Sequence, residues 1–289
     1  MHYIQAKSLL SAKNGINIYR GCTHGCIYCD SRSTVYQMDH MFEDVAVKAN
    51  AAELLEDALS RKRRRCMIGF GSMSDPYLPL EKEVKLTRRC LEIIAAKRFG
   101  VSLITKSDLV LRDTDLLTEI NEKAKAVVSM TLTTADDALC KIIEPHAPDT
   151  SKRAEALSAL HDAGIPAIVW LGPVLPFIND TEENLHELLS MCKDAHVYGI
   201  LCFGFGLTLR EGNREYFYQQ LDKSFPGLSE RYEKTFGNAY SCASPKSPKL
   251  MRIFRRYCAE YGIVSDTDEL FSFMNTIRPE KSAVQAKLF

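Results

Sequence analysis

The chain has 289 residues, of which 46% are hydrophobic and 26% charged, a composition typical of a soluble globular protein with a large core. Lys plus Arg and Asp plus Glu number 37 each. The zero net charge therefore does not favour a nucleic-acid or membrane partner, although a local basic patch stays open. The first residues lack the apolar core of a signal peptide, and no apolar run approaches the roughly 18 residues that span a bilayer. We therefore expect a cytoplasmic protein.

Short apolar segments alternate with amphipathic stretches along the first two thirds of the chain. Amphipathic helices are indicated, for example, by Leu54, Leu55 and Leu59 on one face, and by a helix that stops at Gly164 before Pro166. Segments rich in Val, Ile, Leu or Phe are typical of strands buried on both faces. The predicted strands are 15–20, 67–70, 101–105, 126–131, 167–175 and 199–207.

This alternation predicts an α/β fold with a parallel sheet and right-handed crossovers. Six strand–helix units fit a partial (β/α)6 barrel of the TIM type, open on one side, and a flat doubly wound sheet is the alternative. The alternation fades after about Arg210. We predict a core over residues 1–210 and a mainly helical C-terminal extension over residues 211–289, packed on the core.

Ten cysteines are many for a chain without an export signal, and metal binding or catalysis explains them better than disulfides. Cys22, Cys26 and Cys29 form a C-x3-C-x2-C motif in a loop over residues 20–30, directly after the first predicted strand. Loops at the carboxyl ends of barrel strands build active sites. A [4Fe–4S] cluster usually has four cysteine ligands, so three leave one iron open. S-adenosylmethionine (SAM) can bind that iron through its amino and carboxylate groups.

Other interpretations of the cysteines stay open. A structural zinc ion takes four protein ligands, and His24 inside the loop is the available fourth, at an awkward spacing. The three cysteines can also be unrelated buried thiols, as we expect for most of the other seven. Cys242, in a Ser/Pro-rich segment, is the one candidate catalytic residue, as a radical relay.

The motif, with the aromatic Tyr28 before its last cysteine, resembles the radical SAM superfamily, which shares C-x3-C-x-aromatic-C. The resemblance covers most of the chain. It is strongest for the branch of small stand-alone proteins related to spore photoproduct lyase, a DNA repair enzyme. The further segments that carry it are 71–77, 105–107, Glu144-Pro145, Arg153 and 172–180.

The resemblance implies an enzyme with a [4Fe–4S] cluster and SAM as cofactors. Reductive cleavage of SAM would yield a 5′-deoxyadenosyl radical, which abstracts hydrogen from an unidentified substrate. Reduced flavodoxin or ferredoxin is the implied electron donor. The positions assigned to SAM are Tyr28 and Leu175 at the adenine, Ser72 and Ser74 at the amino group, Lys106 and Arg153 at the carboxylate or ribose, and Ser129 and Thr131 at the ribose.

Each assignment has a structural alternative. Lys106 can be a solvated residue at a strand end, and Arg153 a charge on a helix face. Ser129 and Thr131 fit the core of a strand equally well. Glu144-Pro145 can mainly shape a turn.

One departure from the branch bears on the substrate. Spore photoproduct lyase has a hydrogen-donating cysteine after its second strand, where this chain has Ser72 or Met73. We therefore do not expect repair of spore photoproduct. A nucleic-acid lesion, a peptide and a small metabolite stay open as substrates. A non-catalytic iron–sulfur or zinc regulator, or a partner of a second radical SAM protein, are the alternatives.

A basic run, Arg61-Lys62-Arg63-Arg64-Arg65, precedes the second predicted strand. It can contact phosphates of a nucleic acid. Favourable charge at a helix C-terminus is the simpler explanation, because the run follows an apolar helical face and lies at the barrel bottom, far from the cysteines.

Overall fold

A computed structural model describes residues 1–278. Its centre is a six-stranded parallel sheet in the order β2-β5-β6-β7-β8-β9. Each strand follows its neighbour in the chain, as expected for successive strand–helix units. The predicted α/β fold with six parallel strands is therefore confirmed. The strands are β2 (Gly15–Ile16), β5 (Met67–Phe70), β6 (Gly100–Thr105), β7 (Ala126–Leu132), β8 (Ala167–Leu171) and β9 (Gly199–Leu201).

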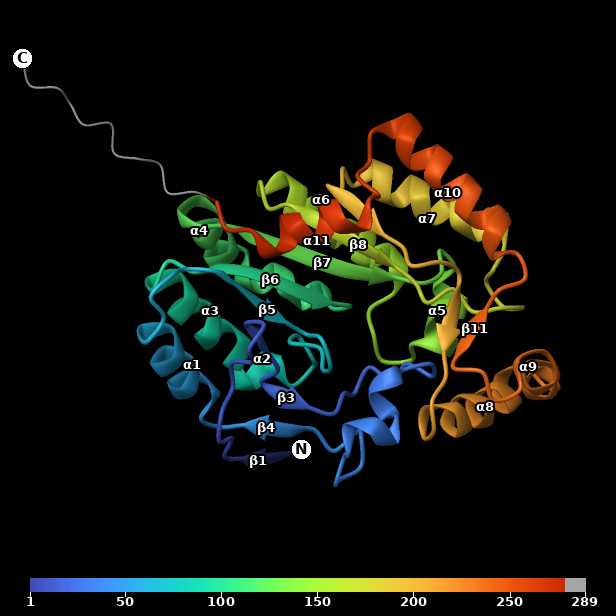
Figure 1. The fold of residues 1–289 in the computed structure, drawn as a ribbon, viewed down its shortest axis with the longest axis horizontal. Coiled ribbons are helices and arrows are strands. Elements are labelled where there is room, and N and C mark those ends of the chain that lie inside the picture. The colour runs from blue at the N-terminus through green and yellow to red at the C-terminus, as the bar shows by residue number, and fades with distance from the viewer. Residues whose placement is uncertain (279–289) are drawn as a thin grey trace, which may run out of the picture.

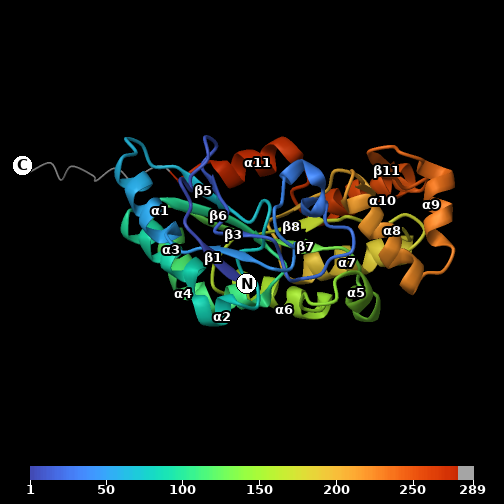
Figure 2. The same ribbon diagram turned by 90° about the horizontal axis from the view of Figure 1, so that it is seen from below.

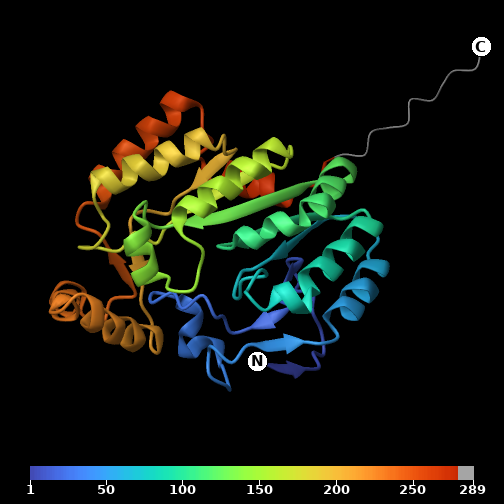
Figure 3. The ribbon, with the colours of Figure 1, turned by 180° about the vertical axis from the view of Figure 1, so that it is seen from behind.

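One face of the sheet is covered by the helices that connect the strands, as Figure 3 shows from behind. Apolar residues of these helices, such as Leu91, Leu117 and Leu157, pack on Val128 and Val169 in one continuous core. Burial of such side chains is the main stabilising term of the fold. The helices are α1 (Ala51–Ser60), α2 (Glu81–Val84), α3 (Leu86–Ala96), α4 (Thr114–Lys123), α5 (Asp137–Ile143), α6 (Thr150–Asp162) and α7 (Glu182–Asp194).

Three predicted strands differ in extent from the structure. Segment 15–20 divides into β2 and β3 (Tyr19–Arg20), and β3 joins a second sheet with β1 (His2–Ile4) and β4 (Ala46–Lys48). Strand β8 stops before the cis peptide Gly172-Pro173. Segment 199–207 divides into β9 and β10 (Gly206–Thr208), because Gly204 and Gly206 have φ of +111° and +149°. Prediction from apolar residues alone therefore makes two of these strands too long, because it does not take the glycines and the proline into account.

The chain after Arg210 is mainly helical, with α8 (Asn213–Ser224), α9 (Leu228–Phe236), α10 (Ser247–Tyr261) and α11 (Thr267–Asn275). Strand β11 (Ser241–Ala243) pairs antiparallel with β10. Helix α11 lies on the sheet face opposite to α3 and α4 (Figures 1 and 2), where Leu270 and Met274 pack on Val127 and Ile168. The domain boundary at residue 210 stays a prediction, and residues 279–289 of the predicted extension lie outside the described residues. No helix within residues 1–278 has the length and apolar character to cross a bilayer.

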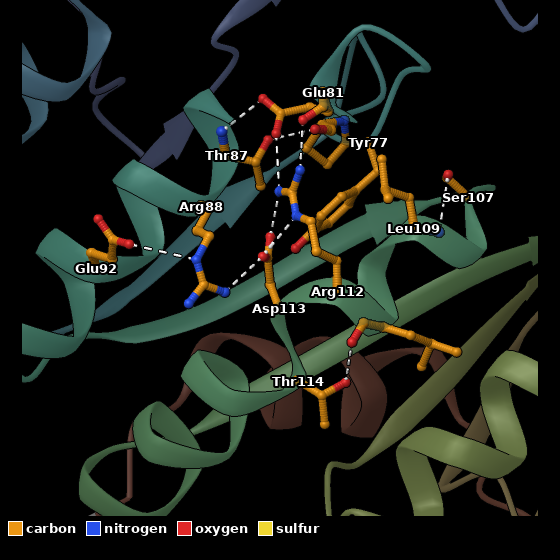
Figure 4. A network of polar contacts seen from close by, with 12 residues as sticks. Tyr77, Glu81, Thr87, Arg88, Glu92, Ser107, Leu109, Arg112, Asp113 and Thr114 are labelled. Carbon is orange, nitrogen blue, oxygen red and sulfur yellow. Dashed lines mark hydrogen bonds and ion pairs between the residues drawn. The ribbon is translucent and has the colours of Figure 1, made fainter. Parts of the chain in front are cut away.

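A buried ionic network around Glu81, Arg112 and Asp113 (Figure 4) contacts β3, which leads into the cysteine loop. Glu81 is fully buried and accepts hydrogen bonds from the Tyr19 hydroxyl and from Arg112 Nη2, the latter at 3.1 Å. Arg112 also pairs with the buried Asp113, at 2.7 Å. A buried carboxylate is tolerated only when charges and donors satisfy it. The network therefore joins β3, α2 and the 3₁₀ turn at 108–113.

Asp75 fixes the segment after β5 in a similar way. Its carboxylate accepts hydrogen bonds from Tyr77 N at 2.8 Å, Thr105 Oγ1 at 2.6 Å and Lys106 N at 2.7 Å. Burial alone would raise its pKa, but the facing His24 and these donors more than offset burial and lower the pKa of Asp75 to about 2. Asp75 thereby fastens the segment after β5 to the end of β6.

The Glu81→Ala variant should lose about 3 kcal/mol of unfolding free energy, because Arg112 and the Tyr19 hydroxyl are left without their carboxylate partner. Urea unfolding followed by circular dichroism measures the loss. Glu83→Ala, at an exposed position of the same helix, is the control and should stay within about 0.5 kcal/mol of wild type. Equal losses in both variants would contradict the role of the network.

Asp75→Asn should make stability less dependent on pH. The folded-state pKa of Asp75 is depressed from 3.8 to about 2, so its contribution is present above pH 3.8 and is lost as pH falls toward 2. The depression corresponds to roughly 2 kcal/mol. The difference in unfolding free energy between wild type and variant, measured by urea unfolding of cluster-free protein from about pH 6 to pH 3, should shrink with acidification. A constant difference would refute this assignment.

Candidate active site

The cysteine loop follows β3 and depends on two glycines. Gly21 has φ of +90°, and a Cβ there would lie 2.4 Å from the carbonyl oxygen of Phe42. That oxygen accepts a hydrogen bond from Cys22 N at 3.0 Å. Gly25 has φ of +72° and faces Pro145, which a Cβ would approach to 3.0 Å. The unusual backbone angles expected of a tight metal-binding loop are present at both glycines.

The loop sets its three cysteines in a largely buried position. Cys26 is 7% exposed, and Cys22 and Cys29 are half-buried. Burial, followed by the nearby Cys29, raises the pKa of the Cys22 thiol to about 12, and burial raises that of Cys26 well above its ordinary value. Metal ligation replaces the thiol proton, and iron then compensates the buried negative charge. The residues present therefore fit an iron–sulfur cluster.

The spacing of the thiols bears on the zinc alternative. Tetrahedral zinc holds sulfur ligands at 2.3 Å and thus roughly 3.8 Å from one another. Within residues 1–278, the one group of three His, Cys, Asp or Glu side chains whose ligand atoms lie within 4.8 Å of one another is His2, His40 and Asp44, which includes none of the three cysteines. The three thiols are more widely spaced, which suits a polynuclear cluster better than a single ion.

His24, the suggested fourth zinc ligand, is engaged elsewhere. Its Nε2 lies 3.1 Å from Asp75 Oδ2, and its side chain is 3% exposed. Its Nδ1 lies 3.5 Å from the carbonyl oxygen of His146. His24 therefore ties the cysteine loop to the segment after β5, and no pattern in the sequence indicates Asp75 as its partner.

Glu144, at the end of α5, is the centre of a second buried network beside the cysteines. Its carboxylate accepts hydrogen bonds from the Tyr28 hydroxyl and from Arg153 Nη2, and it lies 4.0 Å from Lys106 Nζ. Glu144 and Arg153 are both fully buried. Burial would raise the pKa of Glu144, but the charges of Arg153 and Lys106 more than offset burial and hold it below the ordinary range. Glu144 is thus an ionised carboxylate that orders the surrounding donors.

Lys106 is the cation of the site that reaches toward the cysteines. It follows β6, its side chain is 18% exposed, and its Nζ lies 5.7 Å from the centroid of the Tyr28 ring. Burial alone would lower its pKa, but Cys26 and Glu144 raise it. Its ammonium therefore stays charged. Carboxyl ends of parallel strands gather catalytic groups, and Lys106 lies at such an end.

Arg153 does not face the solvent. Its Nη1 donates to Thr131 O at 3.0 Å and its Nε to Pro148 O at 2.8 Å. The guanidinium forms an ion pair with Glu144 and thereby holds this carboxylate in place. The interpretation as a charge on a helix face is wrong, because burial requires this pairing. The predicted contact of Arg153 with SAM stays a prediction.

The other predicted SAM positions lie in varied surroundings. Ser72 is exposed, 3.2 Å from Asn17 Nδ2, whereas Ser74 is buried and donates to Gly21 O at 2.5 Å. Thr131 is 7% exposed on β7. Ser129, also on β7, is buried with its Oγ 3.6 Å from Met274 Sδ of α11.

Leu175 and Cys242 belong to a second apolar core beneath the cysteine loop. Both are fully buried, and the Cys242 thiol lies 3.7 Å from Ala239 O, with a pKa raised by burial. The second core consists of Cys26, Ile27, Tyr28, Ile143, Leu175, Leu207, Leu209, Phe217, Leu221, Tyr232 and Cys242.

A cavity of about 380 Å³ opens at the carboxyl ends of β8 and β9. Its lining includes Trp170, Phe203, Gly172 and Gly204, and none of the described residues that line it is Asp, Glu, Lys or Arg. The Phe203 ring is 68% exposed and lies 5.9 Å from the Trp170 ring. Such a neutral, partly aromatic cavity suits an uncharged ligand group.

The chain matches the model of the radical SAM superfamily over residues 16–190, more than half of its length. It is 32% identical over 227 residues to an uncharacterised protein of Mycobacterium tuberculosis, covering 76% of this chain and 66% of that protein. It is also 37% identical over 186 residues to an uncharacterised protein of Methanocaldococcus jannaschii, covering 64% of this chain and 69% of that protein. This chain therefore spans about two thirds of the length of these relatives.

A solved structure of a spore photoproduct lyase variant with bound AdoMet and dinucleoside spore photoproduct has a similar fold. The TM-score is 0.61 at 17% identity, and the match covers 86% of this chain and 73% of that one. Identity at this level shows a shared fold alone. The family match confirms the predicted resemblance, together with the [4Fe–4S] cluster and SAM as the cofactors of this family, and the chain belongs to the radical SAM superfamily.

Proposed function

We propose that this protein is an enzyme in which Cys22, Cys26 and Cys29 hold a [4Fe–4S] cluster through which SAM is cleaved reductively. The observation that carries the proposal is the buried three-cysteine loop beside Lys106 and the Glu144 network. When bound, the cluster and SAM supply a 5′-deoxyadenosyl radical that abstracts hydrogen from the substrate. A reduced flavodoxin or ferredoxin supplies the electron, and the protein acts in the cytoplasm.

In this proposal the residues around Glu144 bind and orient SAM. Lys106 offers its ammonium to the SAM carboxylate, and Tyr28 is held by Glu144 with its ring beside Lys106. Arg153 acts through Glu144 as a positioning residue, because its guanidinium is fully buried. Ser74 and Ser129 are engaged with Gly21 and Met274, so contacts with SAM would require new hydroxyl orientations.

The remaining proposed SAM contacts follow from position. Ser72 is exposed beside the cysteine loop, on the segment after β5, and would take the amino group. Thr131 lies near the carboxyl end of β7 and would take the ribose. Leu175 packs in the second core with Tyr28, at the adenine side.

The substrate is proposed to enter with an uncharged part at the cavity of β8 and β9, where Trp170 and Phe203 are the contact surface. The segment after β5 has Ser72 and Met73 where a hydrogen-donating cysteine would be needed for repair of spore photoproduct. A different reaction is therefore proposed. A more distant relative, 22% identical over 253 residues and named radical SAM Nalpha-GlyT isomerase, from Pseudomonas phage M6, supports diversity of reactions on this fold. Cys242, buried in the second core, is retained as a candidate radical relay.

Cys26→Ala should lose the cluster and SAM cleavage together, because two thiolates cannot hold the cluster in place. The test is anaerobic reconstitution with iron and sulfide, then dithionite and SAM, with 5′-deoxyadenosine read by mass spectrometry. Cys66→Ala, a half-buried thiol outside the motif, is the control and should retain both properties. Undiminished 5′-deoxyadenosine from Cys26→Ala would overturn the site assignment.

Glu144→Gln should keep the cluster but weaken SAM binding about 10- to 100-fold, because supporting contacts of a metal site contribute on this scale. The amide still accepts from Tyr28 but no longer balances Arg153 and Lys106. SAM affinity is measured by the change that SAM causes in the EPR spectrum of the reduced cluster. Glu155→Gln, exposed on α6, is the control. An unchanged affinity in Glu144→Gln with intact cluster content would show that Glu144 has no part in SAM binding.

A further inference from the structure

A second cavity, of about 390 Å³, is lined almost entirely by cations. Six of its seven lining residues are Arg63, Arg64, Arg65, Arg98, Lys123 and Arg278, and the seventh is Ile277. Within residues 1–278, no acidic side chain lines it. In a chain with equal numbers of acidic and basic residues, this concentration of one charge is local. Like charges gathered in a hollow raise the local concentration of anions.

The cations come from four separate segments. Arg63 to Arg65 precede β5, Arg98 precedes β6, Lys123 ends α4 before β7, and Arg278 follows α11. They therefore converge at the amino-terminal edge of the sheet, opposite to the edge that carries the cysteine loop. Figures 1 and 3 show the chain beyond α11 reaching α4 there, and Arg278 Nη1 donates to Asn121 O of α4 at 2.9 Å. Only the first of these segments stands out in the sequence, as a run of basic residues.

Helix ends explain part of this charge. Helices α1, α3 and α4 all end at this edge, and each C-terminus has about half a negative charge. Glu119 pairs with Lys123. Together these account for about two to three of the six positive charges. Within residues 1–278, Arg63, Arg64 and Arg98 have no acidic partner. Among the described residues these three arginines are cations without an ion pair, so favourable helix-end charge alone does not explain the cluster.

The contacts of one further cation fix the segment that carries Arg278. Lys125, at the foot of β7, donates to the carbonyl oxygens of Phe273 at 2.5 Å and Thr276 at 3.3 Å, which fastens the segment that carries Arg278. Burial and then the charge of Arg278 lower the pKa of Lys125 to about 8, as expected where positive charges are crowded.

We propose that this basic cavity binds adjacent phosphates of a nucleic-acid backbone. A single phosphate has about two negative charges at neutral pH, which is fewer than the positive charges that line this cavity. Successive phosphodiesters supply one charge each along an extended strand, which suits arginines spread over four segments. Arginine also matches phosphate with paired donors. The site goes beyond the proposed function and does not rest on it, since it lies at the opposite edge of the sheet.

The test measures oligonucleotide binding to the reconstituted protein under anaerobic conditions. Fluorescein-labelled 20-nucleotide DNA and RNA strands are titrated by anisotropy at several salt concentrations. Arg63→Glu/Arg64→Glu should weaken binding at least tenfold at low salt. It should also reduce the slope of log affinity against log salt by about 1.4, because each lost single-strand phosphate contact contributes about 0.7. Arg98→Glu, from a different segment, should weaken binding in the same direction.

The matched control is Arg255→Glu/Arg256→Glu, two adjacent exposed arginines on α10 that do not line the cavity. It should leave affinity within twofold and the slope unchanged. Equal effects of both double variants, or binding unaffected by Arg63→Glu/Arg64→Glu, would overturn the proposal. Binding of inorganic pyrophosphate or ATP without binding of either oligonucleotide would replace the nucleic acid by a small phosphorylated ligand. The 5′-deoxyadenosine assay on the same preparations separates this outcome from failure of the proposed enzymatic function.

Discussion

The buried carboxylate of Glu144 is the contact on which the candidate active site depends. It joins Tyr28 of the cysteine loop, Arg153 of α6 and Lys106 after β6, three segments that the chain separates widely. An ionised carboxylate with no solvent exposure needs opposite charge and hydrogen-bond donors close by. Because Arg153 is equally buried, neither partner is stable in this position without the other. The loop and its surroundings are therefore placed as one unit.

Asp75 and Glu81 extend the same constraint around the loop. Asp75 meets His24 within the motif, and Glu81 meets Tyr19 just before it. Three buried carboxylates thus contact the loop or the strand before it, and Cys26, Ile27 and Tyr28 of the loop pack in the second core. This arrangement gives the thiols fixed positions before any metal binds, which reduces the ordering that cluster assembly requires.

The parallel sheet was predictable because its signal is local. Segments such as β5 and β7 are short and apolar, and the stretches between them have the periodicity of amphipathic helices. The structure has strands and helices at these places. The cysteine motif was predictable for the same reason, since its ligands lie within eight residues. The Glu144 network could not be predicted, because its members are joined only by tertiary packing. The family resemblance marked Glu144 and its three partners one by one, but nothing in the sequence indicated that they contact one another, and a turn explained Glu144-Pro145 equally well. The pattern of apolar residues in segment 15–20 also does not indicate that the segment divides between two sheets.

The two edges of the sheet differ in a way that follows from its topology. At the carboxyl edge, helices begin and loops are free to carry thiols, a cation and the neutral cavity near Trp170. At the amino edge, the helices end, and their negative dipole ends permit cations to collect without destabilising the core. Within residues 1–278, Arg63, Arg64 and Arg98 there have no ion pair, whereas Lys106 at the other edge is matched by Glu144. Charge that is balanced inside the protein serves to position residues, and charge that is left unbalanced at its surface is available to a ligand.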